Sequence, residues 1–298
     1  MNVAITETTE PALLRAAVQR ALAGVPHCYP VSEDELAQAL EGPQSCKAAD
    51  RLGNDRIWLA GSPAEPLGML HLATERPESG GQPRGAIRFF WFAPGCEAAG
   101  AELLARAEAS LREQGVSRLI AWHYDHTYPF YHAEHAYLTQ QHGHTHTLLQ
   151  AQGYQEYGSE VVLDWPHYDP TPPPSILLPI KLTYEWERGR AARRGLVLLA
   201  RTEKDEAGVC VCISLGEFSR APEAQNWLYT RWLGVAEEWR RRGLGRYLMR
   251  QALHTLHGEG YRHAAICALG DNEPALALYT GLGYQVVDWT RAYEKTLA

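Results

Sequence analysis

The second half of the chain alternates short hydrophobic blocks with polar turns, which predicts a succession of strands and helices. A helix over 244–256 is predicted because apolar residues recur there at every fourth position. A second helix is expected from Asp271 to Gly281, where cap residues precede an early proline, and a third over 184–194. Hydrophobic blocks of strand length lie at 196–200, 208–215, 226–235, 263–269 and 285–288. This order of elements predicts a mixed α/β or α+β sheet.

The first half repeats this order of elements. It has strand-like blocks at 56–60, 67–72, 87–92 and 117–122. A helix is predicted over 98–114. The pattern LxxxxGYQ occurs at 148–155 and again at 278–285, and Trp91 aligns with Trp232. We interpret the chain as an internal duplication whose first copy is about four residues shorter after its tryptophan and longer before LxxxxGYQ; chance similarity of short segments is the alternative.

A proline-rich segment separates the two copies. Prolines cluster between Pro166 and Pro179, and such a stretch is excluded from helix interiors and central strands. We therefore predict a first domain over 1–165, a linker over 166–179 and a second domain over 180–298.

Composition narrows the class of protein. The chain has 298 residues, 45% of them hydrophobic, and a formal net charge of −7. The acidic balance argues against a general nucleic-acid surface, and no apolar run has the length of a membrane span. The N-terminal residues have neither the basic nor the apolar region of a signal peptide. With six cysteines and no CxxC spacing, we expect a cytoplasmic protein with reduced thiols.

The segment from Val235 to Gly245 carries the strongest chemical signal. It joins a predicted strand to a helix, and the first amides of a helix have no intrahelical acceptor and attract anions. Gly243 and Gly245 allow close approach of a ligand to the backbone. Three consecutive arginines add positive charge: Arg240, Arg241 and Arg242. We interpret the segment as a diphosphate-binding loop; the alternative is a solvated basic helix start.

This segment is followed by Asp271-Asn272-Glu273-Pro274-Ala275 and then by Leu278-Tyr279-x-x-Leu282-Gly283-Tyr284. Together these motifs resemble motifs A and B of the GNAT superfamily of acyl-CoA-dependent N-acyltransferases, over residues 228–294. The resemblance implies two tandem GNAT-like domains, each a mixed, mostly antiparallel sheet flanked by helices. It also implies acetyl-CoA as co-substrate and a primary amine that attacks it directly in a ternary complex. The two-domain arrangement loosely resembles mycothiol synthase-like enzymes.

The resemblance also implies roles for individual residues. Strand backbone would bind the pantetheine arm, loop amides would hold the pyrophosphate, and Tyr279 would protonate the departing thiolate. The cofactor-binding residues implied are Leu233, Gly234, Val235, Arg240, Arg241, Arg242, Gly243, Leu244, Gly245, Arg246, Asn272 and Tyr279. Tyr279 has an alternative reading as a half-buried helix aromatic.

The general base is less well indicated. The predicted strand 227–232 contains no Asp or Glu, so Glu217, after the preceding strand, is the candidate; its alternative is a solvated surface residue. Arg231 either binds an acidic group of the acceptor or extends from the sheet into solvent. A competing function is a non-catalytic acyl-CoA-binding or sensing module.

The first copy departs from the motif. Its loop, 94–100, has no arginine and contains Glu97, and Leu149 stands where Tyr279 stands. We expect this half not to catalyse, and to bind acetyl-CoA weakly or not at all. Seven histidines fall between His123 and His146. They could form a Zn²⁺ or Ni²⁺ site, and the alternative is a polar loop with hydrogen-bonded histidines. We assign no metal ligand.

Overall fold

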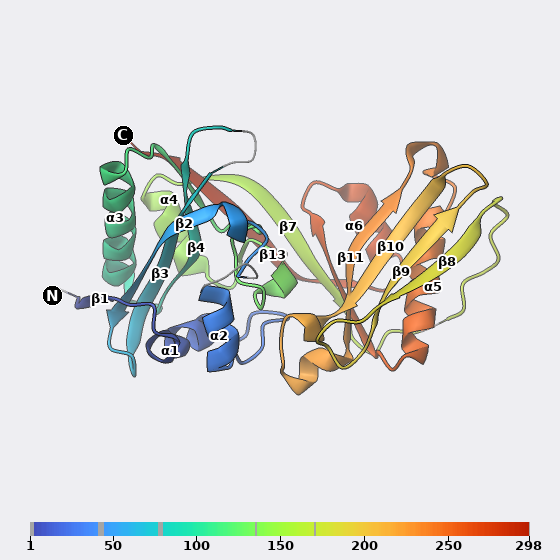
Figure 1. Cartoon of the computed structure of the whole chain (residues 1–298), viewed down its shortest axis with the longest axis horizontal. Helices are drawn as coiled ribbons and strands as arrows, with labels where there is room; N and C mark the ends of the chain where they lie inside the picture. Colours follow the sequence, from blue (N-terminus) through green and yellow to red (C-terminus); the bar gives the residue numbers. More distant parts are fainter. Residues whose placement is uncertain (1–2, 41–44, 77–79, 135, 170, 298) are drawn as a thin grey trace. The chain divides into compact units, whose positions relative to one another are not determined.

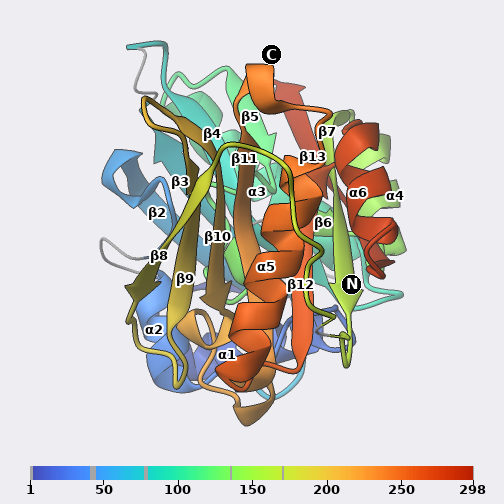
Figure 2. The same ribbon diagram turned by 90° about the vertical axis from the view of Figure 1, so that its right-hand side faces the viewer.

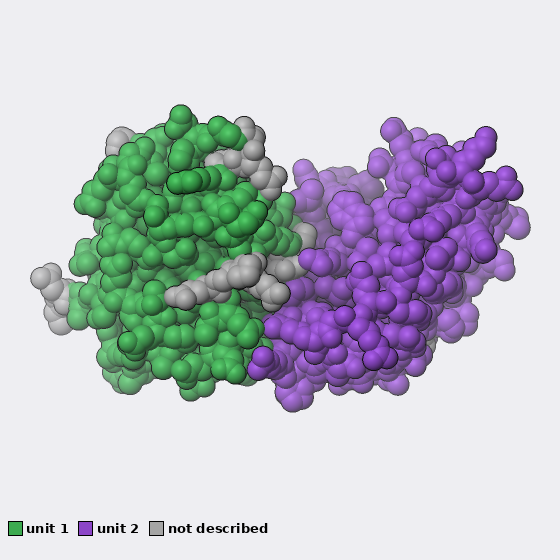
Figure 3. All heavy atoms as spheres, in the orientation of Figure 1, with its two compact units in different colours: residues 1–160, 288–298 green, residues 161–287 purple. Residues whose placement is uncertain are grey.

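The computed structural model describes residues 3–40, 45–76, 80–134, 136–169 and 171–297. Two compact units make up the chain (Figure 1, Figure 3). Unit 1 comprises Met1–Glu160 and Asp288–Ala298, and unit 2 comprises Val161–Val287. Among the described residues, no helix combines the length and the apolar character that a membrane crossing requires.

Unit 1 is built on a mixed sheet with the strand order β1-β2-β3-β4-β5-β13. All neighbouring pairs in it are antiparallel except β4 and β5, which are parallel. Its strands are β1 (Ile5–Glu7), β2 (Leu52–Gly61), β3 (Pro66–Glu75), β4 (Arg84–Phe92) and β5 (Arg118–Ala121), with the short β6 (Leu138–Thr139) paired to β13. Its helices are α1 (Pro11–Leu22), α2 (Glu33–Leu40), α3 (Glu97–Glu113) and α4 (Gly143–Ala151).

Unit 2 has the strand order β7-β12-β11-β10-β9-β8. The pair β11 and β12 is parallel, and the strands from β8 to β11 are antiparallel. Its strands are β8 (Lys181–Glu187), β9 (Gly195–Arg201), β10 (Glu206–Ser214), β11 (Trp227–Val235) and β12 (His263–Leu269). The helix α5 (Leu244–Gly258) lies across one face of this sheet (Figure 2), and α6 (Glu273–Thr280) follows β12.

The chain passes between the units within two strands. β7 (Gln155–Trp165) begins in unit 1 and ends next to β12, whereas β13 (Gln285–Thr296) begins in unit 2 and ends paired to β5. In the strand order, β13 therefore follows β5 and β7 precedes β12. The domain bounds expected from the sequence, 1–165 and 180–298 with a linker over 166–179, stay a prediction, because periodicity within a strand carries no information about which neighbour the strand joins.

The two sheets repeat an irregular feature at equivalent places. The pairing of β4 with β3 skips Arg88, and the pairing of β11 with β10 skips Arg231, so each strand has a β-bulge there. Counted from these bulges, Phe89 corresponds to Trp232. The alignment of Trp91 with Trp232 is therefore displaced by two residues, and the first copy's loop is two residues shorter instead of four.

Most of the elements expected from the sequence are present, but the helix predicted over 184–194 is wrong. Residues 181–187 form the strand β8, and 188–194 form the connection to β9. The side chains of Leu182 and Trp186 pack against the core of unit 2, and the Tyr184 hydroxyl accepts a hydrogen bond from Gln251 of α5. These side chains repeat at every second position, which is the period of a strand.

Candidate functional site

The parallel strands β11 and β12 separate part-way along their length. They pair from Trp227 with His263 to Thr230 with Ile266. Among the described residues, the stretch 231–235 has no pairing to β12, although residues 232–235 stay paired to β10. The opening begins at the bulge, since an unpaired residue bends the strand locally. A segment of backbone is thus left open toward β12.

Two large exposed side chains lie on the strands at this opening, and neither was predicted from the sequence to be a site residue. Trp232 is 63% exposed and Leu269 is 51% exposed, whereas most large apolar side chains of unit 2 are buried. The sequence does contain a pattern that indicates Trp232: it directly follows the polar residues Thr230 and Arg231 in an otherwise apolar strand. Exposed apolar side chains beside an open strand edge favour a ligand-binding surface.

The loop after β11 has the backbone geometry of an anion site. Arg241 (φ 58°) and Gly243 (φ 82°) both adopt positive φ, and α5 starts at Leu244. The first helical hydrogen bond runs from the Tyr247 N–H to the Gly243 carbonyl, at 3.0 Å. The amides of the first helical turn therefore have no intrahelical acceptor and can bind an anion.

Gly245 keeps the space between the loop and the strand open. A Cβ added at Gly245 would lie 3.6 Å from a Val235 methyl carbon and 3.7 Å from a Leu278 methyl carbon. These are ordinary van der Waals distances, so the glycine leaves about one methyl group of space between α5, β11 and α6.

The arginines of the loop surround this space. Arg240 Nε donates to the Val235 carbonyl at 2.9 Å, and the Arg242 guanidinium lies 5.3 Å from the centre of the Trp239 ring. Arg246 Nη1 donates to the Gly281 carbonyl at 3.0 Å, which ties α5 to the end of α6. The guanidinium groups of this loop and first helical turn are exposed, so they are available to an anionic ligand.

Tyr279 lies on α6 and is 6% exposed. Burial raises the pKa of its hydroxyl above the usual value, and the nearby Cys210 thiol adds to that shift. The phenol therefore carries its proton throughout the neutral pH range. Among the described residues it has no hydrogen-bond partner, so its proton is available to a ligand.

Asn272 serves as the N-cap of α6. Its side-chain oxygen accepts a hydrogen bond from the Ala275 N–H at 3.2 Å. The side-chain amide nitrogen is left for another partner. The role that the resemblance implied for Asn272 at the cofactor arm and its capping role use different atoms.

Glu217 lies at the other end of β11. It ends the short 3-10 helix Leu215–Glu217, directly after the β10 residue Ser214, which pairs with Leu228 near the start of β11. Its carboxylate accepts hydrogen bonds from the amides of Arg190 (2.9 Å) and Ala191 (3.1 Å). The structure thus gives this carboxylate partners in the β8–β9 connection, away from the loop at Val235.

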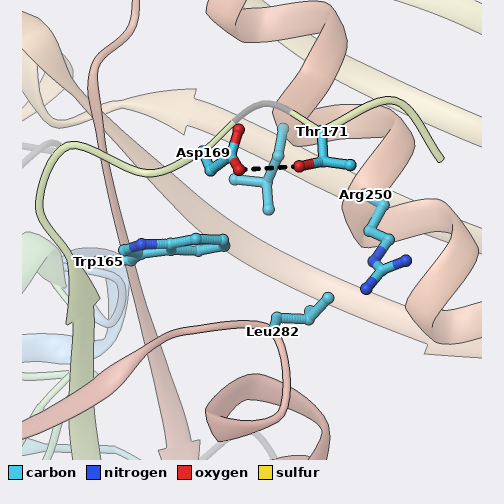
Figure 4. Close-up of a pocket in the computed structure, with 6 residues that line it drawn as sticks. Trp165, Asp169, Thr171, Arg250 and Leu282 are labelled. Atoms are coloured by element: carbon cyan, nitrogen blue, oxygen red, sulfur yellow. Dashed lines mark hydrogen bonds between the residues drawn. The ribbon is translucent and has the colours of Figure 1, made fainter.

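A separate depression of about 230 Å³ lies beside α5 (Figure 4). Asp169 and Thr171 of the segment after β7 form one rim, where the Thr171 hydroxyl donates to the Asp169 carboxylate at 2.9 Å. Arg250 lies six residues after Leu244, about 9 Å farther along the helix. The depression is lined by Trp165, Asp169, Thr171, Arg250, Leu253 and Leu282. It is therefore distinct from the loop at Val235.

The histidine-rich segment of unit 1 forms hydrogen bonds within the protein. His144 Nε2 pairs with the Phe92 carbonyl at 2.8 Å, and His146 pairs with the Tyr293 hydroxyl at 2.7 Å and the Thr139 carbonyl at 2.9 Å. His135 lies outside the described residues. Within the described part of the chain, no three His, Cys, Asp or Glu side chains are grouped so that they could hold a metal ion.

Part of the chain matches the model of a known protein family. Residues 156–284 match the model of the acetyltransferase (GNAT) family. This part of the chain, less than half of its length, is similar to the GNAT family. The matched GNAT segment nearly coincides with unit 2, and its loop and splayed strand are the features described above.

Curated relatives match over short stretches. The chain is 37% identical over 75 residues to a mycothiol acetyltransferase of Corynebacterium glutamicum (strain R), which is 25% of each protein. It is 43% identical over 56 residues to the mycothiol acetyltransferase of Corynebacterium diphtheriae, which is 19% of this chain and 18% of that protein. The matches thus span a quarter or less of those relatives.

Solved structures match over the full length. A tandem GNAT protein from the clavulanic acid biosynthesis pathway aligns with a TM-score of 0.71 and 15% identity, over 100% of this chain and 99% of that one. A GCN5-related N-acetyltransferase from Sphaerobacter thermophilus aligns with a TM-score of 0.63 and 13% identity, over 99% and 96% of the two chains. The expected tandem GNAT fold and the GNAT resemblance are confirmed.

Proposed function

We propose that unit 2 is an acetyl-CoA-dependent N-acetyltransferase, which transfers an acetyl group to a primary amine by direct attack in a ternary complex. One observation carries this proposal: the unpaired stretch of β11 leads directly to the bare amides at the start of α5. An open strand edge suits an extended, amide-containing arm, and a helix N-terminus suits a diphosphate. The GNAT match supports the same chemistry.

The binding residues fit such a ligand. Backbone groups of Leu233, Gly234 and Val235 would pair with the pantetheine arm along the open edge. The amides from Arg241 to Gly245 would hold the pyrophosphate, with the loop guanidiniums and Arg246 neutralising its charge. The Arg240 amide, which the resemblance included in this set, already donates to the Glu237 carbonyl at 3.2 Å. The Asn272 side-chain amide nitrogen would donate to the arm, since only its oxygen is used by the helix cap.

In the reaction, the neutral amine attacks the thioester carbonyl carbon, the C–N bond forms and the C–S bond breaks. The Val235 N–H would stabilise the developing negative charge on the carbonyl oxygen. Tyr279 would donate its proton to the departing sulfur, and the proton lost by the amine passes to a base. Holding the two reactants together would supply up to about 7–11 kcal/mol of the barrier reduction.

The mechanism also requires a general base. β11 contains no Asp or Glu, and Glu217 stays the candidate predicted from the sequence. Its two hydrogen bonds to the β8–β9 connection favour a role in holding that turn. A Glu217→Gln variant distinguishes a base from a structural contact. If Glu217 is the base, the variant loses the acidic limb of the pH profile of kcat/KM. If Glu217 only holds the turn, the variant is less stable and the pH profile of kcat/KM is unchanged.

The competing proposal is a non-catalytic acyl-CoA-binding module, which the absence of a carboxylate on β11 favours. Calorimetric titration with acetyl-CoA, followed by thiol release against a panel of primary amines, distinguishes the two. Binding with thiol release supports the transferase. Binding without release across the panel supports the module, and no binding contradicts both.

Tyr279→Phe tests the proposed acid directly. Removing the hydroxyl should lower kcat about 10- to 100-fold, while the dissociation constant of acetyl-CoA stays unchanged, because the hydroxyl acts on the departing sulfur. Tyr184→Phe, on the exposed strand β8, is the control and should keep full activity. Unchanged turnover in Tyr279→Phe would remove this residue from the mechanism.

A further inference from the structure

A second concentration of positive charge in unit 2 lies away from the loop 236–243 between β11 and α5, which we call the cofactor loop. The connection between β8 and β9 contains Arg188, Arg190, Arg193 and Arg194. A cavity of about 450 Å³ is lined by Arg188, Gly189, Ala191, Ala192, Arg193, Arg194 and Glu259. In unit 1 the first two strands are connected through the helices α1 and α2 instead. We call residues 188–194 the arginine turn.

Side chains from other elements fix the backbone of the arginine turn. The Glu217 carboxylate accepts the amides of Arg190 and Ala191, and the Gln225 side-chain oxygen accepts the Ala192 N–H at 3.1 Å. A Cβ at Gly189 would lie 2.2 Å from a Glu217 carboxylate oxygen, so the contact requires glycine there. A solvated loop needs no such support, and fixed backbone reduces the entropy lost when a ligand binds.

The guanidinium groups of the turn differ in how many of their N–H donors already bind protein acceptors. Arg194 forms a paired contact with Glu259, at 2.9 Å for both bonds, and lies 3.8 Å from the centre of the Trp186 ring. Arg193 donates through Nη1 to the Gln225 carbonyl at 2.6 Å. Arg188 has no partner among the described residues. Free N–H donors therefore remain on Arg188 and Arg193.

The charges of this site do not cancel. The cavity is lined by three arginines, Arg188, Arg193 and Arg194, and by one carboxylate, that of Glu259, in a chain whose formal net charge is −7. The turn contacts residues 217 and 225, before the start of β11, whereas the cofactor loop follows its end. The nine residues of β11 separate the two sites by roughly 25–30 Å. One small ligand does not reach both.

We propose that the arginine turn is a binding site for a phosphate group, with Arg188 and Arg193 as the principal donors. Arginine offers planar paired donors that match phosphate oxygens, and the cavity between these side chains leaves space for the group. The phosphate belongs to a free anion or to a phosphorylated peptide.

Titration of the full chain with inorganic phosphate tests the proposal. To exclude the cofactor loop, the titration is done in an Arg241→Ala/Arg242→Ala background. We expect saturable binding in this background, weakened about tenfold by the further change Arg188→Ala, which removes donors that have no partner among the described residues. Unchanged affinity in the Arg188→Ala variant, or no saturation up to about 50 mM phosphate, would overturn the proposal.

Two further arms complete the experiment. Arg201→Ala removes a half-exposed arginine that pairs with Glu185 at 3.5 Å, and phosphate affinity should stay unchanged. An equal loss in Arg201→Ala would mean diffuse charge attraction and would contradict a built site. A phosphoserine peptide that binds tighter than inorganic phosphate assigns the site to protein-borne phosphate, and equal affinity assigns it to the free anion.

Discussion

The two units share one framework and differ in whether the space beside the splayed strand is filled. Phe92 of β4 and Val235 of β11 occupy equivalent places, as do Gly100 of α3 and Gly245 of α5. A Cβ at Gly100 would lie 2.6 Å from the Phe92 ring, whereas at Gly245 the nearest atom is 3.6 Å away. In unit 1, a phenylalanine ring fills the position where unit 2 has space.

The filling of unit 1 continues with its inserted segment. Trp122 and Tyr128 are fully buried and lie 5.3 Å and 5.2 Å from Phe89, between ring centres. His144 lies edge-on against Phe92 and pairs with its carbonyl, whereas the equivalent carbonyl of Val235 pairs with the exposed Arg240. The same bulged strand therefore supports a closed core in unit 1 and an open space in unit 2, depending on the side chains beside it.

The largest expected effect comes from making unit 2 resemble unit 1. Val235→Phe should place a ring in the open space and weaken acetyl-CoA binding at least about 100-fold, or about 2.7 kcal/mol, with unit 2 still folded. Calorimetry measures the affinity. The matched variant Phe92→Val should destabilise unit 1 by roughly 2–4 kcal/mol and leave acetyl-CoA affinity unchanged. Equal acetyl-CoA affinity in the wild type and in Val235→Phe would mean that acetyl-CoA does not bind beside Val235.

The next effect is an acid sensitivity of unit 1. Burial lowers the pKa of His71, His123 and His142 to about 4. A nearby positive charge adds to the shift: that of Arg88 for His71, and that of a neighbouring histidine for His123 and His142. Unfolded histidine has a pKa near 6.5, so between pH 6.5 and 4 the unfolded state binds more protons than the folded state. The free energy of unfolding of unit 1 therefore decreases as the pH is lowered through this range. For the fully buried His71 alone the loss is about 3 kcal/mol.

Hydrogen exchange at a series of pH values, corrected for the intrinsic exchange rate, measures this loss. The opening free energy of β3 and β4 should fall as the pH is lowered from 6.5 to 4, and a His71→Gln variant should show a smaller fall. Identical pH dependence in unit 1 of both proteins would contradict a buried neutral His71.

The smallest expected effect concerns the two helix glycines. Gly100→Ala should destabilise unit 1 by about 1–3 kcal/mol, because the new methyl group overlaps Phe92 and Leu148. Gly245→Ala should be neutral or slightly stabilising without ligand, since its Cβ meets only ordinary contacts. Thermal unfolding of both variants measures the difference, and equal shifts would contradict a filled unit 1.

Local features of both units could be predicted from the sequence. The amphipathic helix at 244–256, the capped helix after Asn272 and the strand at 263–269 follow from periodicity and cap residues, and the structure contains them. The match of Leu149 to Tyr279 also holds: the Tyr154 and Tyr284 amides donate to them equivalently, at 3.0 and 3.1 Å. Spacing within a segment is enough for such features.

Features that depend on distant partners could not be predicted. The exchange of β7 and β13 depends on which sheet edge each strand meets, and the bulges at Arg88 and Arg231 depend on register with a neighbouring strand. The turn after β8 was assigned to a helix because the local sequence does not reveal that Glu217 and Gln225 hold its backbone. The roles predicted for the cofactor residues and for Glu217 stay predictions.

The most direct test is hydrogen exchange of the full chain with and without acetyl-CoA. We expect new protection at the amides of residues 240–246 and along residues 231–235, with no change at residues 93–100 of unit 1. Protection at 93–100, or none at 240–246 under saturating acetyl-CoA, would contradict this expectation.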